Sequence, residues 1–392
     1  MSSAVRRTRR EILADAAKMA AAASVSGLAG CFPNVGGSWP DAASPAGCTD
    51  PDGGATNAPP TVPSPVVEVY RQDSVTTGAK TAIQEPVVAD MLDAGLAALA
   101  RQISLLNGLS AQDGGPGMVE AAQTESDGGV DNPWKVLLPN YKPGQRIGLK
   151  INCLNDIVPT SPALTRSIIA SLRDKLGVDP KTIVVWDRGY DELTLAKYSP
   201  DELFGAQLLG TKVVTLKNPS PATPGEPDYG DPISPPIECQ SPRLSHILTD
   251  LTDLTINCPV FKHHGVSGVT GAMKNIYGVI DIPKNYHNNI NTALPKLYAL
   301  PQIRNSICLT IVDALVSVTV GDTSDRADNT PCRILLSQDP VAMDSYALAL
   351  LNQIRAAWNN SAVTPVDPSL TQWLANAANA GLGNTSYTLY QV

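Results

Sequence analysis

The sequence predicts an α/β fold with a doubly wound, mostly parallel sheet and flanking helices. Short runs of β-branched and other apolar residues alternate with segments of helical periodicity from about residue 146 to beyond residue 340. The strand runs are continuously apolar, which is typical of strands that helices cover on both faces. No internal repeat is present in the 392 residues, so we expect one α/β domain rather than an array.

The predicted elements follow in order along the chain. Residues 85–106 repeat apolar side chains at helical spacing, from Val88 and Met91 to Ile103. Asp339 stands where a helix N-cap belongs, and Pro340 occupies the first helical position. The strands are predicted at residues 66–70, 146–153, 182–187, 212–216, 254–261, 307–313 and 333–336, and the helices at 85–106, 162–176, near 203 and from 340 onward.

The first thirty residues have the pattern of a twin-arginine signal peptide. Residues 8–13 read Thr-Arg-Arg-Glu-Ile-Leu and precede an Ala-rich stretch that ends at Gly30. Small residues before Cys31 suit a lipoprotein peptidase, and the thiol of Cys31 is the predicted lipidation site. The alternatives are a cleaved signal without lipid and a basic N-terminal helix of a soluble protein. The pattern favours export by the twin-arginine machinery to the periplasm or cell surface.

The remaining chain divides into a tether and a domain. Residues 31–65 are rich in Pro, Gly, Ser, Ala and Asp, a composition that predicts a flexible tether. Residues 66–392 are predicted to form the single α/β domain. No later stretch reaches the ~18 to 20 apolar residues of a spanning helix, so we expect membrane attachment through the lipid at Cys31.

Charge and cysteine content narrow the classes of function. The net charge of −8 and the lack of a basic run argue against a nucleic-acid partner, because such proteins carry a positive surface. An even number of cysteines follows Cys31, consistent with disulfides in an oxidising compartment. A twin-arginine substrate folds before export, so we expect such disulfides to form late. These cysteines are Cys48, Cys153, Cys239, Cys258, Cys308 and Cys332.

Polar residues stand at the ends of four predicted strands. Ligands of open parallel sheets bind beyond the carboxyl ends of the strands, where these side chains meet. Each one alone is more easily explained as a helix cap or a surface loop residue, but their coincidence favours a shared pocket. The residues are Lys150, Asn152 and Cys153 at the end of the predicted strand 146–153, Asp187 and Arg188 at the end of 182–187, Lys262, His263 and His264 after 254–261, and Asp313 at the end of 307–313.

A glycine-rich segment, residues 262–278, is the densest source of candidate ligand contacts. Its glycines allow the backbone to approach a ligand, and a helix start there would bind an anion through backbone N–H groups. The spacing is neither a Walker A loop nor Gly-x-Gly-x-x-Gly, so standard nucleotide binding is not supported. The predicted ligand contacts of this segment are Ser267, Gly268, Thr270, Gly271 and Asn275, with Lys274 as an anion-fixing or catalytic amine.

Histidines and a few acidic residues complete the predicted site. His264 and His287 are candidates for proton transfer, together with Lys274 and Asp313. Asp344 either stabilises a helix start or points into the pocket. Imidazole and thiolate also bind zinc and related metals, so Cys153, Cys258 and His263 are the candidate ligands of a divalent metal. Hydrogen-bonded or acid/base histidines are the alternative, because no Cys-x-x-Cys or His-x-x-x-His spacing occurs.

At these residues the chain resembles the family called domain of unknown function 362, and specifically its exported twin-arginine branch. The resemblance covers about residues 66–383 and implies no established reaction. Some members carry ferredoxin-like cysteine clusters, and that spacing does not occur here, so no ferredoxin-type iron–sulfur cluster is expected. The loop after Asp313 also departs from the family pattern. The matching segments are residues 148–153, 186–188, 257–262, 264–265, 268–275, 277–278, 283 with 287, 311–313 and 339–344.

A second resemblance, of site rather than of motif, is to the nickel-pincer lactate racemase superfamily. There a lysine after a glycine-rich loop tethers a cofactor and histidines transfer protons, parts that Lys274, His264 and His287 would take here. Three hypotheses follow for the whole chain. The first is an enzyme for an anionic small molecule, with a metal or a cofactor loaded before export. The others are a lipid-tethered protein that captures an anion without chemistry, and a scaffold for a surface complex.

Overall fold

The computed structural model describes residues 62–77, 81–112, 130–154, 157–211, 227–322, 325–358 and 360–392. The predicted signal peptide, the predicted lipidation site Cys31, nearly all of the predicted tether and the predicted strand at 212–216 lie outside these residues. Within the described ranges, no helix is both long enough and apolar enough to cross a membrane.

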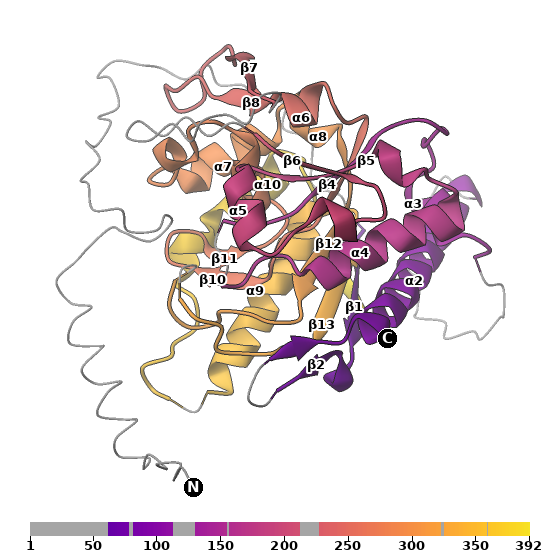
Figure 1. Ribbon diagram of the computed structural model, residues 1–392. Coiled ribbons are helices and arrows are strands. Elements are labelled where there is room, and N and C mark those ends of the chain that lie inside the picture. Colours follow the sequence, from indigo (N-terminus) through magenta and orange to yellow (C-terminus); the bar gives the residue numbers. More distant parts are fainter. Residues whose placement is uncertain are drawn as a thin grey trace, which may run out of the picture.

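An eight-stranded sheet forms the centre of the molecule (Figure 1). Its strands are β1 (Ser64–Tyr70), β4 (Ile147–Lys150), β5 (Ile183–Asp187), β6 (Gln207–Gly210), β9 (Leu254–Asn257), β12 (Ile307–Ala314), β13 (Arg333–Ser337) and β14 (Tyr387–Gln391). They are arranged in the order β14-β1-β13-β12-β9-β4-β5-β6. The pairs from β12 to β6 are parallel, as is β1 with β14, and β13 alone runs antiparallel to both neighbours. The predicted doubly wound, mostly parallel sheet is therefore confirmed.

Helices cover both faces of the sheet. They are α2 (Glu85–Gln112), α3 (Pro133–Leu137), α4 (Pro162–Ser171), α5 (Tyr190–Leu195), α6 (His246–Thr249), α7 (Ile290–Tyr298), α8 (Pro301–Arg304), α9 (Pro340–Ala356) and α10 (Gln372–Asn379). Helices α2 and α4 lie together on one side of the sheet and α9 lies on the other (Figure 1). One apolar cluster fills the space under α2 and α4, and a second fills the space under α7, α9 and α10.

Strand β5 shows why the apolar runs are continuous. All five of its residues are buried. Ile183 and Val185 belong to the cluster under α2 and α4, whereas Val184 and Trp186 belong to the cluster on the opposite face. Because successive side chains of a strand point to opposite faces, a strand covered on both sides needs apolar residues at every position.

The structure corrects several predicted elements. The predicted strand at 254–261 ends at Asn257, and residues 262–264 instead form β10 (Lys262–His264), which pairs with β11 (Gly268–Thr270) in a separate hairpin. The predicted helix start near Thr270 is therefore wrong. The predicted helix near residue 203 is a short 3-10 turn at Pro200–Glu202, and α5 precedes it. Two further small sheets pair β2 (Val75–Thr76) with β3 (Ala82–Ile83) and β7 (Tyr229–Pro232) with β8 (Arg243–Ser245).

The expectation of paired cysteines also needs correction. Cys153, Cys258, Cys308 and Cys332 are free thiols, and Cys239 is disulfide-bonded. Three of the free thiols are buried in the domain core, which an even count in the sequence does not reveal.

Candidate functional site

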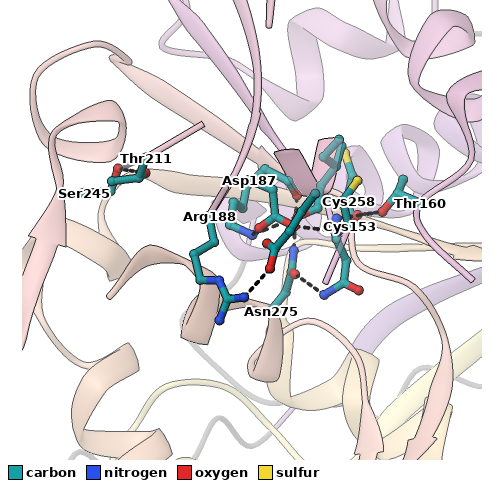
Figure 2. Close-up of polar contacts among 12 residues, drawn as sticks. Cys153, Thr160, Asp187, Arg188, Thr211, Ser245, Cys258 and Asn275 are labelled. Carbon is teal, nitrogen blue, oxygen red and sulfur yellow. Dashed lines mark hydrogen bonds and ion pairs between the residues drawn. The ribbon is translucent and has the colours of Figure 1, made fainter. Parts of the chain in front are cut away.

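A cleft of about 560 Å³ opens beyond the carboxyl ends of β4 and β5. This is where parallel sheets bind ligands, because the loops that follow the strands diverge there. Figure 2 shows Asp187 and Arg188, at the end of β5, lying near Asn275 of the glycine-rich segment. Nine of the residues predicted from the sequence line the cleft: Asn152, Asp187, Arg188, Lys262, His264, Thr270, Lys274, Asn275 and His287.

A buried ion pair forms the floor of the cleft. Nζ of Lys150 donates to Oδ1 of Asp187 at 2.7 Å, and both side chains are at least 96% buried. The second carboxylate oxygen, Oδ2, accepts from the backbone N–H of Cys153 at 2.5 Å. Gly278 lies directly against the pair, since a Cβ there would be 2.7 Å from Nζ of Lys150. Any residue other than glycine at position 278 would displace Lys150 or Asp187.

A chain of side-chain amides connects the Lys262 ammonium to the backbone carbonyl of Ala272. Nζ of Lys262 donates to Oδ1 of Asn152 at 3.1 Å, and Nδ2 of Asn152 donates to Oδ1 of Asn275 at 3.1 Å. Asn275 then donates to Oδ1 of Asn257 at 2.8 Å, and Asn257 donates to the carbonyl of Ala272 at 2.8 Å. Because each amide both donates and accepts, its orientation is determined along the whole chain. The amides therefore hold the Lys262 ammonium at a defined position.

Lys274 and two histidines form the opposite wall. Nδ1 of His287 donates to the carbonyl of Pro283 at 3.0 Å, which leaves Nε2 as an acceptor, and Nζ of Lys274 lies 3.3 Å from it. The same Nζ lies 3.8 Å from the centre of the Tyr277 ring. Burial and the Lys274 charge lower the pKa of His287 to about 3, so this ring is neutral at physiological pH.

The ring of His264 stacks on that of His287, with 5.7 Å between the centroids. Its Nδ1 accepts from the backbone N–H groups of Val266, at 3.0 Å, and Ser267, at 3.4 Å. The proton of the neutral ring therefore lies on Nε2. Burial and then the charge of Lys274 hold the pKa of His264 well below its usual range. The two stacked rings thus have opposite tautomers, one with an accepting Nε2 and one with a donating Nε2.

Arg188 and Glu192 form a second charged pair on the wall at the end of β5. They lie four residues apart, with Arg188 just before the N-cap of α5 and Glu192 in the first turn of that helix, and Nη2 of Arg188 contacts Oε1 of Glu192. The other carboxylate oxygen of Glu192, Oε2, is buried and has no hydrogen-bond partner among the described residues. Burial raises the pKa of Glu192 to about 7 against the opposing effect of Arg188.

The glycine-rich segment is held from inside the protein. The carboxylate of Asp344, on α9, accepts from the backbone N–H of Ala272 at 2.6 Å and of Met273 at 2.9 Å. Gly271 permits this approach, because a Cβ there would be 2.0 Å from Oδ1 of Asp344. Two backbone N–H groups of the segment that was predicted to bind an external anion thus bind a carboxylate of the same chain. Gly268 packs beside Thr371. The Ser267 hydroxyl forms a hydrogen bond within the hairpin.

Asp313 does not line the cleft. One of its carboxylate oxygens accepts from the backbone N–H of Ser161, the N-cap of α4, at 2.7 Å, and the other accepts from that of Leu315 at 3.0 Å. These bonds hold the start of α4 beside β12. Asp313 therefore fixes the backbone, and it is not among the residues that line the cleft.

The three predicted metal ligands do not form a ligand set. Cys153 and Cys258 are buried thiols, and burial raises the pKa of both. His263 faces away from its neighbours on β10, because alternate residues of a strand point to opposite faces, and its Nδ1 contacts the carbonyl of Gly321. No group of three or more His, Cys, Asp or Glu side chains within the described ranges could hold a metal ion. No step of a mechanism is therefore assigned to a metal at these residues.

Several residues that line the cleft were not among the site residues predicted from the sequence. Glu192, Tyr277, Gly278 and Pro283 also line the cleft. Glu192 follows Arg188 by four residues, but Arg188 precedes the helix, so helical spacing does not predict this pair. The role of Gly278 depends on a contact with residues about 90 and 130 positions away, for which the sequence carries no local signal.

Comparisons with known proteins find a matching family model and a distantly similar solved structure. The family model described as Domain of unknown function (DUF362) matches residues 147–349, which include every side chain that lines the cleft. No curated protein matches the chain. A solved structure of a Thermotoga maritima protein, a structural genomics target, has 10% sequence identity and a TM-score of 0.36. The match covers 55% of this chain and 56% of that chain, and a similarity this low carries no argument about function.

Proposed function

Because the chain belongs to the family described as Domain of unknown function (DUF362), which states no reaction, we propose a function from the site itself: the cleft binds an anionic small molecule. The observation that carries this proposal is the charge of the described lining residues. Arg188, Lys262 and Lys274 outnumber the carboxylates Asp187 and Glu192, and Lys150 lies directly behind the lining. Positive charge in a largely buried cleft attracts an anion more strongly than it would in water.

The two ammonium groups of Lys262 and Lys274 are the main anion contacts. Nζ of Lys262 donates to the amide oxygen of Asn152, and Nζ of Lys274 lies 3.3 Å from the ring nitrogen of His287. These contacts help to fix the two ammonium groups. The cleft is therefore arranged to bind an anion with little reorganisation.

Proton transfer is the chemistry proposed for this site. Nε2 of His287 is a neutral acceptor beside the Lys274 ammonium, and Nε2 of His264 is a donor on the stacked ring. An acid and an acceptor on the same wall suit a reaction that moves a proton on or off a bound anion. A non-catalytic capture protein is the second candidate, since the lysines alone suffice for binding. A cofactor loaded before export remains a prediction.

Binding is tested by thermal unfolding with a panel of carboxylates and phosphates at matched ionic strength. A ligand at a hundred times its Kd stabilises the protein by about 2.7 kcal/mol. We expect at least one anion to raise the Tm of the wild type, with a smaller shift for Lys274→Met and an unchanged shift for the control Lys181→Met, an exposed lysine. If no anion changes the Tm at matched ionic strength, the proposal is wrong.

Catalysis and capture are separated by His264→Ala and His287→Ala. The proton-transfer proposal expects these variants to bind the identified anion and to lose exchange of its acidic protons with deuterated solvent, followed by NMR. If the wild type binds the anion and exchanges nothing, capture is the better account. Elemental and mass analysis of protein purified from its native compartment tests for a loaded metal or organic cofactor.

The proposal places this site outside the cytoplasm on a lipid anchor. The paired arginines at residues 9 and 10 and the small residues before Cys31 support it. In the full chain, Cys31→Ser should move the protein from the detergent phase to the aqueous phase in phase partitioning. Replacing Arg9 and Arg10 by lysine should leave it in the cytoplasm. Retention of the Cys31→Ser protein in the detergent phase would argue against the anchor, and export despite paired lysines would argue against the twin-arginine route.

A further inference from the structure

The cleft has two ends with different chemistry. At one end, His264 stacks on His287, whose Nε2 lies 3.3 Å from Nζ of Lys274, and β10 places Lys262 two residues before His264. At the other end, Glu192 contacts Arg188, which follows Asp187 at the end of β5. Each end is thus surrounded by its own charged groups. A ligand that fills the cleft contacts a cationic end and an end that contains carboxylates.

At the carboxylate end, Oε2 of Glu192 has no hydrogen-bond partner within the part of the chain that the structure describes. The oxygen is buried, and the side chain as a whole is 85% buried and held through Oε1 by Arg188. Buried polar atoms are nearly always hydrogen-bonded, so an exception that lines a cleft requires an explanation. At pH 8, above the Glu192 pKa of about 7, a hydrogen-bond donor on a bound ligand supplies one, because the ionised carboxylate can only accept.

At the cationic end, Oγ1 of Thr270 is also buried without a hydrogen-bond partner among the described residues. Thr270 is 4% exposed and lies directly opposite Lys262 in the pairing of β10 with β11. Residues opposite each other on paired strands present their side chains on the same face. The Thr270 hydroxyl is therefore a donor beside the Lys262 ammonium, which suits an anionic group.

We propose that the ligand carries a hydroxyl or amino group in addition to its anionic group, with Glu192 accepting from that donor and Lys262 and Thr270 holding the anion. The proposal rests on the proposed function, because it assumes that the cleft binds an anion. It narrows the ligand class from any small anion to hydroxy or amino derivatives of a carboxylate or phosphate. Plain anions of the same size leave Glu192 Oε2 buried without a partner, which is costly.

The experiment compares pairs of anions that differ only in the donor. Suitable pairs are 2-hydroxybutyrate with butyrate, alanine with propionate, and glycerol 3-phosphate with propyl phosphate, titrated calorimetrically into the full-length protein. For the anion class that binds, we expect the member with the donor to have a Kd about tenfold lower or better, the usual effect of a hydrogen bond to a charged group. Thr270→Val should weaken both members of that pair equally.

Glu192→Gln tests the assignment. The amide keeps the size of the side chain and an oxygen for Arg188, and it presents a donor where Oε2 stood. The preference should disappear for the amino compound, whose ammonium can only donate. It should weaken for the hydroxyl compound, which then bonds to a neutral amide in place of a charged carboxylate. Glu202→Gln is the matched control, because Glu202 is 59% exposed and pairs with Arg166 away from the cleft. The wild-type comparison alone decides the ligand class, even if Glu192→Gln unfolds.

The outcomes are distinguishable. Equal affinity of the wild type for both members of a binding pair overturns this inference and leaves the proposed function intact. A preference that persists undiminished in folded Glu192→Gln overturns the assignment of Glu192 as the acceptor. If no member of any pair binds, the proposed function fails and this inference fails with it.

Discussion

At the scale of single residues, the buried charges of this protein are held by specific partners. Lys150 and Asp187 satisfy each other beneath the cleft, and Glu68, only 2% exposed, accepts from Arg333 at 2.8 Å and contacts the hydroxyl of Tyr346. Removing a charge from water is costly unless a partner replaces the water. A buried pair therefore makes both of its members difficult to replace one at a time.

The floor pair gives the first prediction. Asp187→Asn leaves the Lys150 ammonium buried without its anion, and we expect the free energy of unfolding to fall by about 3–5 kcal/mol. Urea unfolding followed by circular dichroism measures the change. The control is Asp253→Asn, which breaks a half-exposed pair with Arg146 and should cost about 1 kcal/mol or less. Equal losses for the two variants would contradict the argument from burial.

The second prediction concerns pH. Burial raises the pKa of Glu192 from 4.5 to about 7, so between these values the native carboxyl keeps a proton that the unfolded chain has lost. The unfolding free energy of the wild type should therefore fall, relative to that of Glu192→Gln, as the pH rises from about 4.5 to 7. Below 4.5 and above 7 the difference should be constant. Urea unfolding of both proteins across pH 4 to 8 tests this, and a difference independent of pH would contradict it.

At the scale of elements, the segment from β11 to the short helical turn at Lys274–Val279 is positioned by side chains from other parts of the chain. Asp344 on α9 binds its backbone on one side, and the pair of Lys150 and Asp187 lies against Gly278 on the other. The turn carries Lys274 and Asn275 into the cleft. Gly271 and Gly278 therefore matter for close packing against polar groups.

The third prediction follows from that packing. Gly278→Ala places a Cβ 2.7 Å from Nζ of Lys150 and 2.9 Å from Oδ1 of Asp187, both buried, so one of them must move. We expect a loss of about 1–3 kcal/mol in the free energy of unfolding and weaker anion binding. Gly108→Ala in α2 is the control, since nothing lies within 4 Å of its Cβ and alanine favours a helix. Chemical denaturation that shows no loss for Gly278→Ala would mean that the floor adapts.

At the scale of the whole molecule, the two ends of the described chain meet in the same sheet. Strand β1 lies between β13 and β14, and β14 is the last strand at that edge. The backbone N–H of Val392 bonds to the carbonyl of Glu68 at 3.0 Å, and the side chain of Gln391 donates to the Glu68 carboxylate at 2.8 Å. The C-terminal strand therefore covers the edge of β1 and helps to position a buried charge.

The fourth prediction is that the full chain lacking residues 387–392 is less stable and self-associates. The deletion removes the partner of β1 and exposes its backbone groups, which pair readily with other chains. We expect the Tm to fall by about 2 °C or more and oligomers to appear in size-exclusion chromatography with light scattering. Thr388→Ala, which removes an exposed side chain and keeps the strand, should behave as the wild type. A monomeric deletion variant with an unchanged Tm would show that β14 is dispensable.

The sequence alone was sufficient for the fold class and for much of the cleft. Continuous apolar runs such as 183–187 show burial on both faces, and burial of this kind implies parallel strands between helices. The carboxyl ends of parallel strands lie at the same edge of the sheet. The sequence therefore predicts that Lys150, Asp187 and the residues near Lys262 lie close together. Both conclusions use only local periodicity and one rule of topology.

Only the tertiary structure decided which polar groups face the cleft and which are used inside the protein. Asp313 lies near the end of a strand, as Asp187 does, yet Asp313 binds the backbone N–H of the distant Ser161 and Asp187 lines the cleft. Asp344, inside a helix, binds the backbone of another distant segment. The reversal of β13 and the absence of a partner for Oε2 of Glu192 among the described residues likewise depend on neighbours far away in sequence. Such contacts are selected by packing of the whole chain, and local sequence patterns carry no record of them.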